Sequence, residues 1–209
     1  MMDLRESALR LWSEAWPKLD GWTRWVRLSR IRNSFMARAV TALSMSSLVL
    51  ANLPAFIQRS GIDVFSLRLV FAGSLVFLIG YVLFAFCAPA EFNQAGEVHD
   101  HVKRMNDLAD AEFIKSRLGL ARGLAARMKA RKEMKPPVAL IHLLEEKIAE
   151  LRGKEADLQA NDGAGLFHAD LALRDHDAPI YRLVVAAAML IGGLCLLYPT
   201  VRNVFRAIF

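Results

Sequence analysis

The stretch LVFAGSLVFLIGYVLFAFCAPA, residues 69–90, contains no charged side chain over 22 positions. At a rise of about 1.5 Å per residue, a helix of this length crosses the hydrocarbon core of a bilayer, which is about 30 Å thick. This segment therefore predicts a transmembrane helix.

Two further uncharged segments lie on either side of it. The segment LVVAAAMLIGGLCLLYPTV, residues 183–201, is framed by Arg182 and Arg202, and Tyr181 and Tyr198 occupy positions typical of interfacial anchors. The segment AVTALSMSSLVLANLPAFI, residues 39–57, contains more polar residues but also lacks charge. We expect three transmembrane helices.

The composition agrees with membrane insertion. Of the 209 residues, 55% are apolar, which is high for a soluble domain of this size, although the formal net charge is +6. The two cysteines, Cys87 and Cys195, lie inside apolar runs. This placement excludes a disulfide-stabilised secreted scaffold and a cysteine-based zinc site.

The first 33 residues carry seven basic and four acidic side chains and all four tryptophans. Their pattern predicts two short amphipathic helices, broken around Pro17 and Gly21, with Asp20 as an N-cap. Indole and arginine side chains favour the headgroup level, so we expect this segment to lie on the membrane surface. The interfacial candidates are Trp12, Trp16, Trp22, Trp25, Arg24, Arg27 and Arg30. In the alternative, the tryptophans pack on the protein's own polar region.

Residues 91–182 form the polar region that is long enough to be a domain. Its periodicity predicts one long helix over Val98–Met134, a stop at Pro136–Pro137, and a second helix from Val138 to about Gln159. Two such helices form an antiparallel hairpin, and a loop around residues 161–165 leads to the last span.

No alternating strand pattern is present, so the sequence predicts an all-α integral membrane protein. Its four parts are an interfacial segment (1–33), a two-helix transmembrane hairpin (34–90), a cytoplasmic helical hairpin (91–182), and a third span with its tail (183–209). Basic residues gather in the first and third parts, and this pattern predicts that both lie in the cytoplasm.

Three groups of residues are candidates for binding. Imidazole and carboxylate side chains that could bind zinc or iron flank the polar region, although their spacing matches no known metal signature; they are His99, His101, His168, His176 and Asp177. A basic run could bind a protein partner or phosphate; its candidates are Arg122, Arg127, Arg131 and Lys132. The run lacks aromatic residues for base stacking, so nucleic acid binding is unsupported.

The basic run has a structural alternative, in which it pairs with the acidic residues of the following helix. The third group consists of small residues at helical spacing in the spans, namely Gly73, Gly80, Ala188 and Gly192. Such residues let helices approach closely, either within the chain or in a homo-oligomer.

No nucleophile elbow, Walker loop, dinucleotide fingerprint or paired-carboxylate site is present, so we expect neither catalysis nor a cofactor. Two other functions remain open. A channel or transporter would need a polar lining, for which Arg38, Thr41, Ser44 and Asn52 are available. A metal-dependent membrane enzyme would need the His/Asp clusters to converge.

The order of RNSFMARAVTALSMSSLVLANLP (32–54), a short connector, LRLVFAGSLVFLIGYVLFAFCAPAEF (67–92) and a charged helical region resembles that of small membrane components of bacterial anti-phage systems. These are the membrane subunit of Kiwa and the two-helix membrane effectors of retron type. The resemblance implies a non-catalytic membrane sensor or effector that acts with a cytoplasmic protein partner. It carries over no functional residue.

Overall fold

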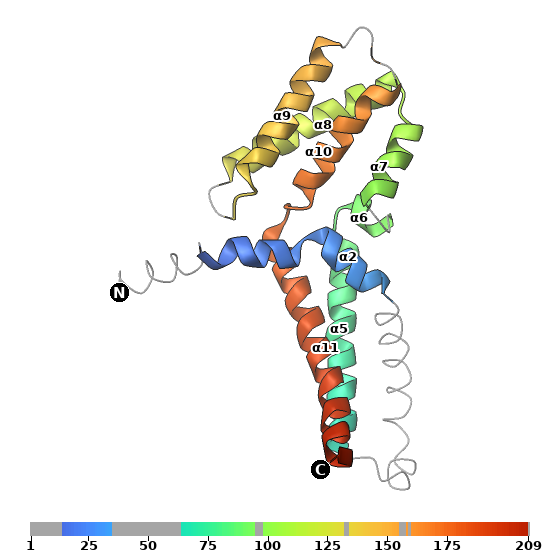
Figure 1. Cartoon of the computed structure of the whole chain (residues 1–209), viewed down its shortest axis with the longest axis vertical. Helices are drawn as coiled ribbons and strands as arrows, with labels where there is room; N and C mark the ends of the chain where they lie inside the picture. Colours follow the sequence, from blue (N-terminus) through green and yellow to red (C-terminus); the bar gives the residue numbers. More distant parts are fainter. Residues whose placement is uncertain are drawn as a thin grey trace, which may run out of the picture. The chain divides into compact units, whose positions relative to one another are not determined.

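The computed structural model describes residues 14–34, 64–94, 98–131, 134–154, 158 and 160–208, and these residues contain helices and no strand. The all-α prediction is confirmed for this part of the chain. After a helix over residues 14–23, the helices are α2 (Trp25–Asn33), α5 (Val64–Cys87), α6 (Ala90–Gln94), α7 (Val98–Asp107), α8 (Ala111–Ala130), α9 (Val138–Gly153), the 3₁₀ helix η1 (Ala160–Gly163), α10 (Ala164–Arg174) and α11 (Pro179–Ile208) (Figure 1).

The chain forms two compact units. The first, which we call the helical domain, contains residues 1–27 and 89–179. The second, which we call the apolar unit, contains residues 28–88 and 180–209. Each unit is therefore built from two separate segments of the chain. The chain passes from one unit to the other inside α2, between α5 and α6, and at the start of α11.

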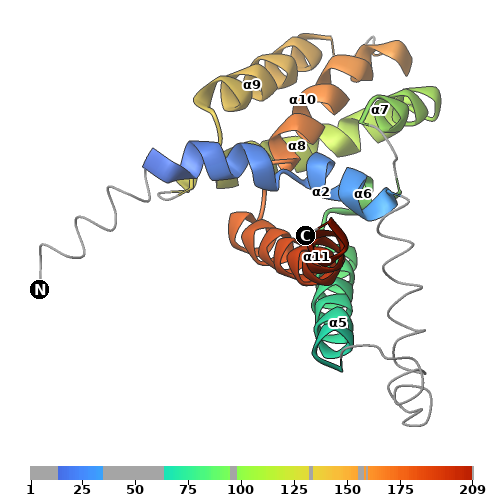
Figure 2. The same ribbon diagram turned by 60° about the horizontal axis from the view of Figure 1, so that its bottom comes forward.

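Helices α7, α8, α9 and α10 make up most of the helical domain. Helix α10 contacts α7, α8 and α9, and it lies between α9 and α7 in two views (Figures 1 and 2). The buried apolar residues of α8 and α9, apart from Leu124, recur at alternating intervals of three and four, the spacing of two helices packed at a small angle. They are Ile114, Leu118, Ala121, Leu124, Ala125 and Met128 on α8, and Ile141, Leu144, Ile148 and Leu151 on α9.

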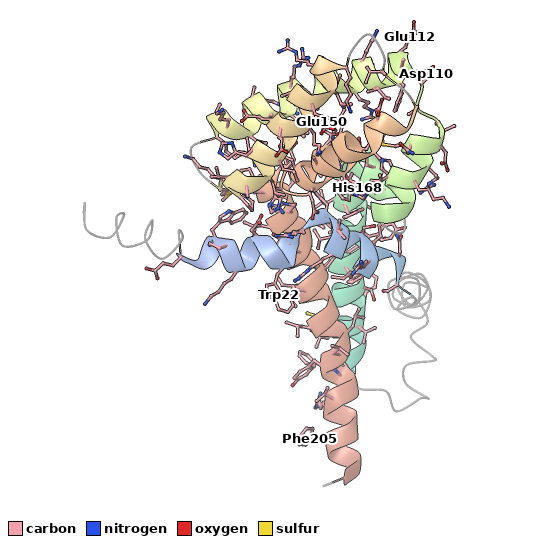
Figure 3. All side chains as sticks on the ribbon, turned by 45° about the horizontal axis from the view of Figure 1, so that its top comes forward. Trp22, Asp110, Glu112, Glu150, His168 and Phe205 are labelled. Carbon is pink, nitrogen blue, oxygen red and sulfur yellow. The ribbon has the colours of Figure 1, made fainter. Side chains whose placement is uncertain are left out.

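The prediction of one long helix over Val98–Met134 is wrong, because the helix is interrupted between the end of α7 at Asp107 and the start of α8 at Ala111. Asp110 is the N-cap of α8, and its Oδ1 accepts a hydrogen bond from the backbone N–H of Phe113 at 2.7 Å. A carboxylate at this position satisfies an N–H group that has no partner within the helix and favours a new helix start. Figure 3 shows Asp110 and Glu112 where α8 begins.

Helix α10 is a second difference between the structure and the sequence prediction. The sequence predicts a loop around residues 161–165 that leads to the last span, and no helix there. Its residues Leu166, Phe167, Leu171 and Leu173 are buried, and the ring of Phe167 meets that of Phe113 edge-on at 5.9 Å. The predicted hairpin is thus part of a larger helical bundle. The second helix begins at Val138 as predicted but ends at Gly153 rather than near Gln159.

In the apolar unit, α5 and α11 pack side by side (Figures 1 and 2). Residues 68–87 of α5 and 179–199 of α11 are long and apolar enough to cross a membrane. These helices correspond to the second and third predicted spans. The first predicted span, residues 39–57, lies outside the described residues, so the expected count of three spans is not tested.

Small residues allow the close contact between α5 and α11. A Cβ atom added at Gly192 would lie 2.7 Å from the carbonyl oxygen of Gly73, and one added at Gly80 would lie 3.1 Å from the Cβ of Ala188. The four small residues of the predicted packing group therefore face one another within one chain.

In the same unit, the guanidinium of Arg32 lies over the ring of Tyr81 at 5.0 Å.

Candidate functional site

The N-terminal segment packs on the turn of residues 175–178 that precedes α11. We call these residues the docking turn. The indole Nε1–H of Trp25 donates to the carbonyl oxygen of Asp177 at 3.1 Å, and the backbone N–H of Val26 donates to Oδ1 of Asp175 at 2.9 Å. Asp175 therefore caps α2 from a position 149 residues away in sequence. Nδ1 of His176 also lies 2.8 Å from Oδ2 of Asp20.

This docking corrects two predictions about the N-terminal segment. Pro17 and Gly21 lie inside the helix over residues 14–23, and the break is at Arg24. Asp20 is consequently inside this helix and is not an N-cap. The break falls where the cap from Asp175 fixes the start of α2, a contact that local sequence cannot reveal.

The tryptophans divide between two environments. Trp16 and Trp25 are buried, with 8% and 0% of their surface exposed, so the prediction that they meet lipid headgroups is wrong. Trp22 is 75% exposed and carries the guanidinium of Arg27 5.6 Å from its ring centre (Figure 3). Arg30 is exposed and Arg24 is half-buried, whereas Trp12 lies outside the described residues.

The His/Asp clusters are not brought together as a metal site. The described residues contain no group of three or more His, Cys, Asp or Glu side chains that could hold a metal ion. His176 and Asp177 belong to the docking turn, where Asp177 Oδ1 accepts from Arg131 at 2.9 Å. His168 is exposed on α10 (Figure 3), and the side chain of His99 is outside the described part.

His101 belongs to a half-buried polar cluster between α6, α7, α8 and α10. Arg117 and Arg174 each place a guanidinium nitrogen 3.5 Å from Oε1 of Glu91, and Nε of Arg174 donates to Oδ2 of Asp170 at 2.8 Å. These ion pairs join three helices of the domain.

Burial shifts the pKa of two members of this cluster. It lowers the pKa of the His101 imidazole, an effect that Glu91 opposes and that Arg104, Arg117 and Arg174 strengthen. It raises the pKa of the Asp170 carboxyl, although Arg174 pulls in the other direction. Within the described structure, His101 Nε2 and Asp170 Oδ1 are buried without a hydrogen-bond partner.

The basic run on α8 is only partly neutralised. Lys129 pairs with Glu145 of α9 at 3.0 Å, and Arg117 and Arg131 pair with Glu91 and Asp177. Pairing with the acidic residues of the following helix, the structural alternative, thus holds for Lys129. Arg117 and Arg131 pair with acidic residues outside α9. Arg127 is exposed, and Lys132 lies outside the described residues.

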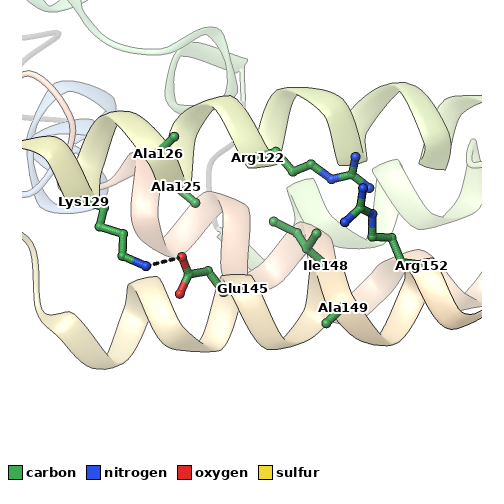
Figure 4. Close-up of a pocket in the computed structure, with 8 residues that line it drawn as sticks. All are labelled: Arg122, Ala125, Ala126, Lys129, Glu145, Ile148, Ala149 and Arg152. Carbon is green, nitrogen blue, oxygen red and sulfur yellow. Dashed lines mark hydrogen bonds and ion pairs between the residues drawn. The ribbon is translucent and has the colours of Figure 1, made fainter.

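Arg122 has a different setting, at a groove between α8 and α9. The groove encloses about 350 Å³ and is lined by Arg122, Ala125, Ala126 and Lys129 of α8 and by Glu145, Ile148, Ala149 and Arg152 of α9 (Figure 4). Arg152 reaches the groove from the opposite helix. It was not among the predicted residues because its role depends on the pairing of α8 with α9.

The sequence matches no known protein-family model, and no similar protein was found among curated proteins or solved structures.

Proposed function

We propose that the chain is a multi-pass protein of the bacterial inner membrane, without catalytic activity, whose helical domain binds a cytoplasmic protein partner and whose apolar helices self-associate. The observation that carries the proposal is the exposure of α5 and α11. Only 28% of the apolar window in α5 and 22% of that in α11 are buried. A core helix of a soluble protein buries most of its apolar surface, so these helices need a lipid or protein environment.

The exposed apolar side chains follow the length of both helices. They include Phe65, Leu75, Ile79, Val82 and Phe86 on α5, and Val184, Leu190, Ile191, Leu194, Leu197, Val201 and Phe205 on α11. Gly193 of α11 has open space around it, unlike Gly192, which contacts α5. Self-association would use this outward face, since the other small residues pack within the chain.

The partner surface is the outward stripe of α8. Leu120 is 55% exposed, and Gly123 and Arg127, which share its helix face at intervals of three and seven residues, are exposed as well. An exposed leucine beside an arginine that forms no ion pair with the described residues suits an acidic protein surface with a small apolar contact.

Membrane insertion is tested first. Carbonate-washed membranes should retain the chain, and detergent should release it. Single cysteines, introduced by Glu150→Cys and Ile62→Cys in a Cys87→Ser, Cys195→Ser background, then report the orientation. In intact spheroplasts an impermeant maleimide should label position 62 and leave position 150 unlabelled until lysis. Labelling of both positions before lysis, or recovery of the chain in buffer without detergent, contradicts the proposal.

Partner binding needs a separate test. A photo-crosslinking amino acid at Leu120 should give one discrete protein adduct in cells. Arg127→Glu should remove this adduct, whereas Lys103→Glu, the matched change at an exposed lysine of α7, should leave it in place. Equal adducts in both variants would show that the stripe of α8 is not the contact surface.

A further inference from the structure

The two arginines of the α8–α9 groove point toward one another at one end, and the Lys129–Glu145 ion pair closes the other end (Figure 4). Between them lies an apolar floor formed by Ala125, Ile148 and Ala149. The groove thus combines a strongly cationic end with a neutral end and a flat apolar centre.

The cationic end has no acceptor among the described residues. Neither Arg122 nor Arg152 forms an ion pair with another described residue, and Nε of Arg122 is closed to water and has no hydrogen-bond partner among them. A buried donor without an acceptor is unfavourable, and two guanidinium groups that face each other repel. An anion placed between them would relieve both costs.

We propose that this groove binds a phosphate monoester, with its phosphoryl oxygens between Arg122 and Arg152 and its organic part on the floor of Ala125, Ile148 and Ala149. A phosphate monoester carries close to two negative charges at neutral pH, which matches two guanidinium groups, and its oxygens suit their planar donor pattern. A carboxylate carries one charge only. Glu145 at the far end would repel a second phosphate, so a ligand with one phosphoryl group fits best.

A volume of about 350 Å³ is at the small end of the range for organic-ligand sites. Such a site could take its phosphate monoester from a free metabolite or from a lipid headgroup. The groove lies entirely in the helical domain, so ligand binding there does not require α5 and α11 to cross a bilayer.

The probe is phenyl phosphate, titrated calorimetrically into the full-length chain in a neutral detergent. We expect saturable binding with one site per chain. Arg122→Gln and Arg152→Gln should each weaken binding about tenfold or more, the usual effect of losing a charge-assisted hydrogen bond. Lys115→Gln, at an exposed lysine of the same helix, should leave the dissociation constant unchanged.

Two further variants separate binding from folding. Ala149→Phe should fill the floor and weaken phenyl phosphate binding, while binding of inorganic phosphate at the arginines persists. Without ligand, Arg122→Gln should leave the unfolding temperature unchanged or raise it, because the mutation removes a repulsion. A lower unfolding temperature without ligand would mean that Arg122 is a structural residue and would overturn the proposal.

The source of the phosphate is distinguished by a second titration with dihexanoyl phosphatidic acid. Tighter binding of this lipid than of phenyl phosphate, lost in Arg152→Gln, assigns the site to lipid headgroups, and the reverse order assigns it to soluble monoesters. Phenyl sulfate, which has a single charge, should bind more weakly than phenyl phosphate. If neither phenyl phosphate nor dihexanoyl phosphatidic acid binds saturably, or if Lys115→Gln weakens binding as much as the groove variants do, the proposed site is contradicted.

Discussion

Ala178 has a backbone φ of 48°, in the left-handed region that side chains with a Cβ atom rarely adopt. It sits between Asp177, whose Oδ1 accepts from the Ala178 N–H at 2.9 Å, and Pro179, which begins α11. Glycine has no penalty for this conformation, so Ala178→Gly should stabilise the protein by about 0.5–1 kcal/mol after the entropy of the unfolded chain is included.

Ala172→Gly is the matched control, because Ala172 lies inside α10 in helical geometry. There the same substitution should destabilise the protein by about 1 kcal/mol. Chemical denaturation in detergent, followed by circular dichroism, measures both changes. The two variants should shift the midpoint in opposite directions, and a loss of stability in both would show that Ala178 is not strained.

His101 gives the protein a pH dependence whose sign follows from its surroundings. Burial lowers the pKa of His101 below its ordinary value of 6.5, so the folded state binds a proton less readily than the unfolded chain. The stabilising contribution is complete above pH 6.5 and is lost as the pH falls through the lower pKa of the folded state.

A His101→Asn variant should therefore lose less stability than the wild type when the pH is lowered from about 7.5 to 5.5. Thermal unfolding at both pH values measures this difference. The pH dependence that Asp170 contributes has the opposite sign. Burial raises the pKa of its carboxyl above the ordinary value of 3.8, so its contribution to stability is lost as the pH rises above 3.8. An equal acid sensitivity in wild type and variant would exclude His101 as its source.

At the level of single residues, the sequence shows which side chains are polar or charged, but it does not show which residues they contact. In the Asp175–His176–Asp177 run, the sequence predicts His176 and Asp177 as metal ligands, but the described residues contain no group that could hold a metal ion. The hydrogen-bond partners of the run include Val26, Trp25 and Arg131, which lie 45 to 152 residues away in sequence. Spacing within the run cannot indicate contacts of that kind.

Between elements, the contact of α5 with α11 depends on Gly192. A Cβ atom there would lie 2.7 Å from two backbone atoms of α5, the Gly73 oxygen and the Phe77 nitrogen. Backbone atoms cannot rotate away, so Gly192→Ala should push the helices apart and destabilise their packing by about 1–3 kcal/mol.

Gly193→Ala provides the control, because the next residue has no atom within 4 Å of an added Cβ. Alanine also favours a helix over glycine, so this variant should be neutral or slightly stabilised. Thermal unfolding in detergent micelles distinguishes the two. Equal melting temperatures would mean that α5 and α11 do not pack through Gly192.

Strong periodicity explains which helices could be predicted. The apolar positions of α9 and the Pro136–Pro137 stop predict its start at Val138 correctly, and α5 and α11 follow from their lack of charge. Helix α10 was missed because its 11 residues follow a Gly-rich stretch and contain Asp170 and His168. The start of α8 was missed because the apolar stripe of Val102, Ala109 and Phe113 continues across the break that Asp110 creates.

At the scale of the whole molecule, the helical domain is discontinuous in sequence. Residues up to Arg27 belong to the same unit as residues 89–179, although the apolar unit includes all the sequence from Leu28 to Ala88. Local sequence patterns divide a chain into consecutive segments, and the pattern of residues 1–33 therefore indicates a separate interfacial part. The hydrogen bonds from Trp25 and Val26 to the docking turn explain why this segment belongs to the domain.

A discontinuous domain should reassemble from its parts. All four tryptophans lie within the first 25 residues, so a fragment of residues 89–179 contains none, and a peptide of residues 14–27 brings three. Mixing the two should shift the tryptophan fluorescence of the peptide to shorter wavelength, because Trp16 and Trp25 become buried. The fragment must first show helical circular dichroism.

Asp175→Ala in this fragment should weaken peptide binding about fivefold, since losing a helix cap costs about 1 kcal/mol. Glu145→Gln, which breaks an exposed ion pair between α8 and α9, should leave the affinity unchanged. A folded fragment that leaves the peptide fluorescence unshifted would show that residues 14–27 do not form part of the domain. In that case the interfacial assignment of Trp16 and Trp25 would again be the better interpretation, because indole rings without a protein partner favour the headgroup level.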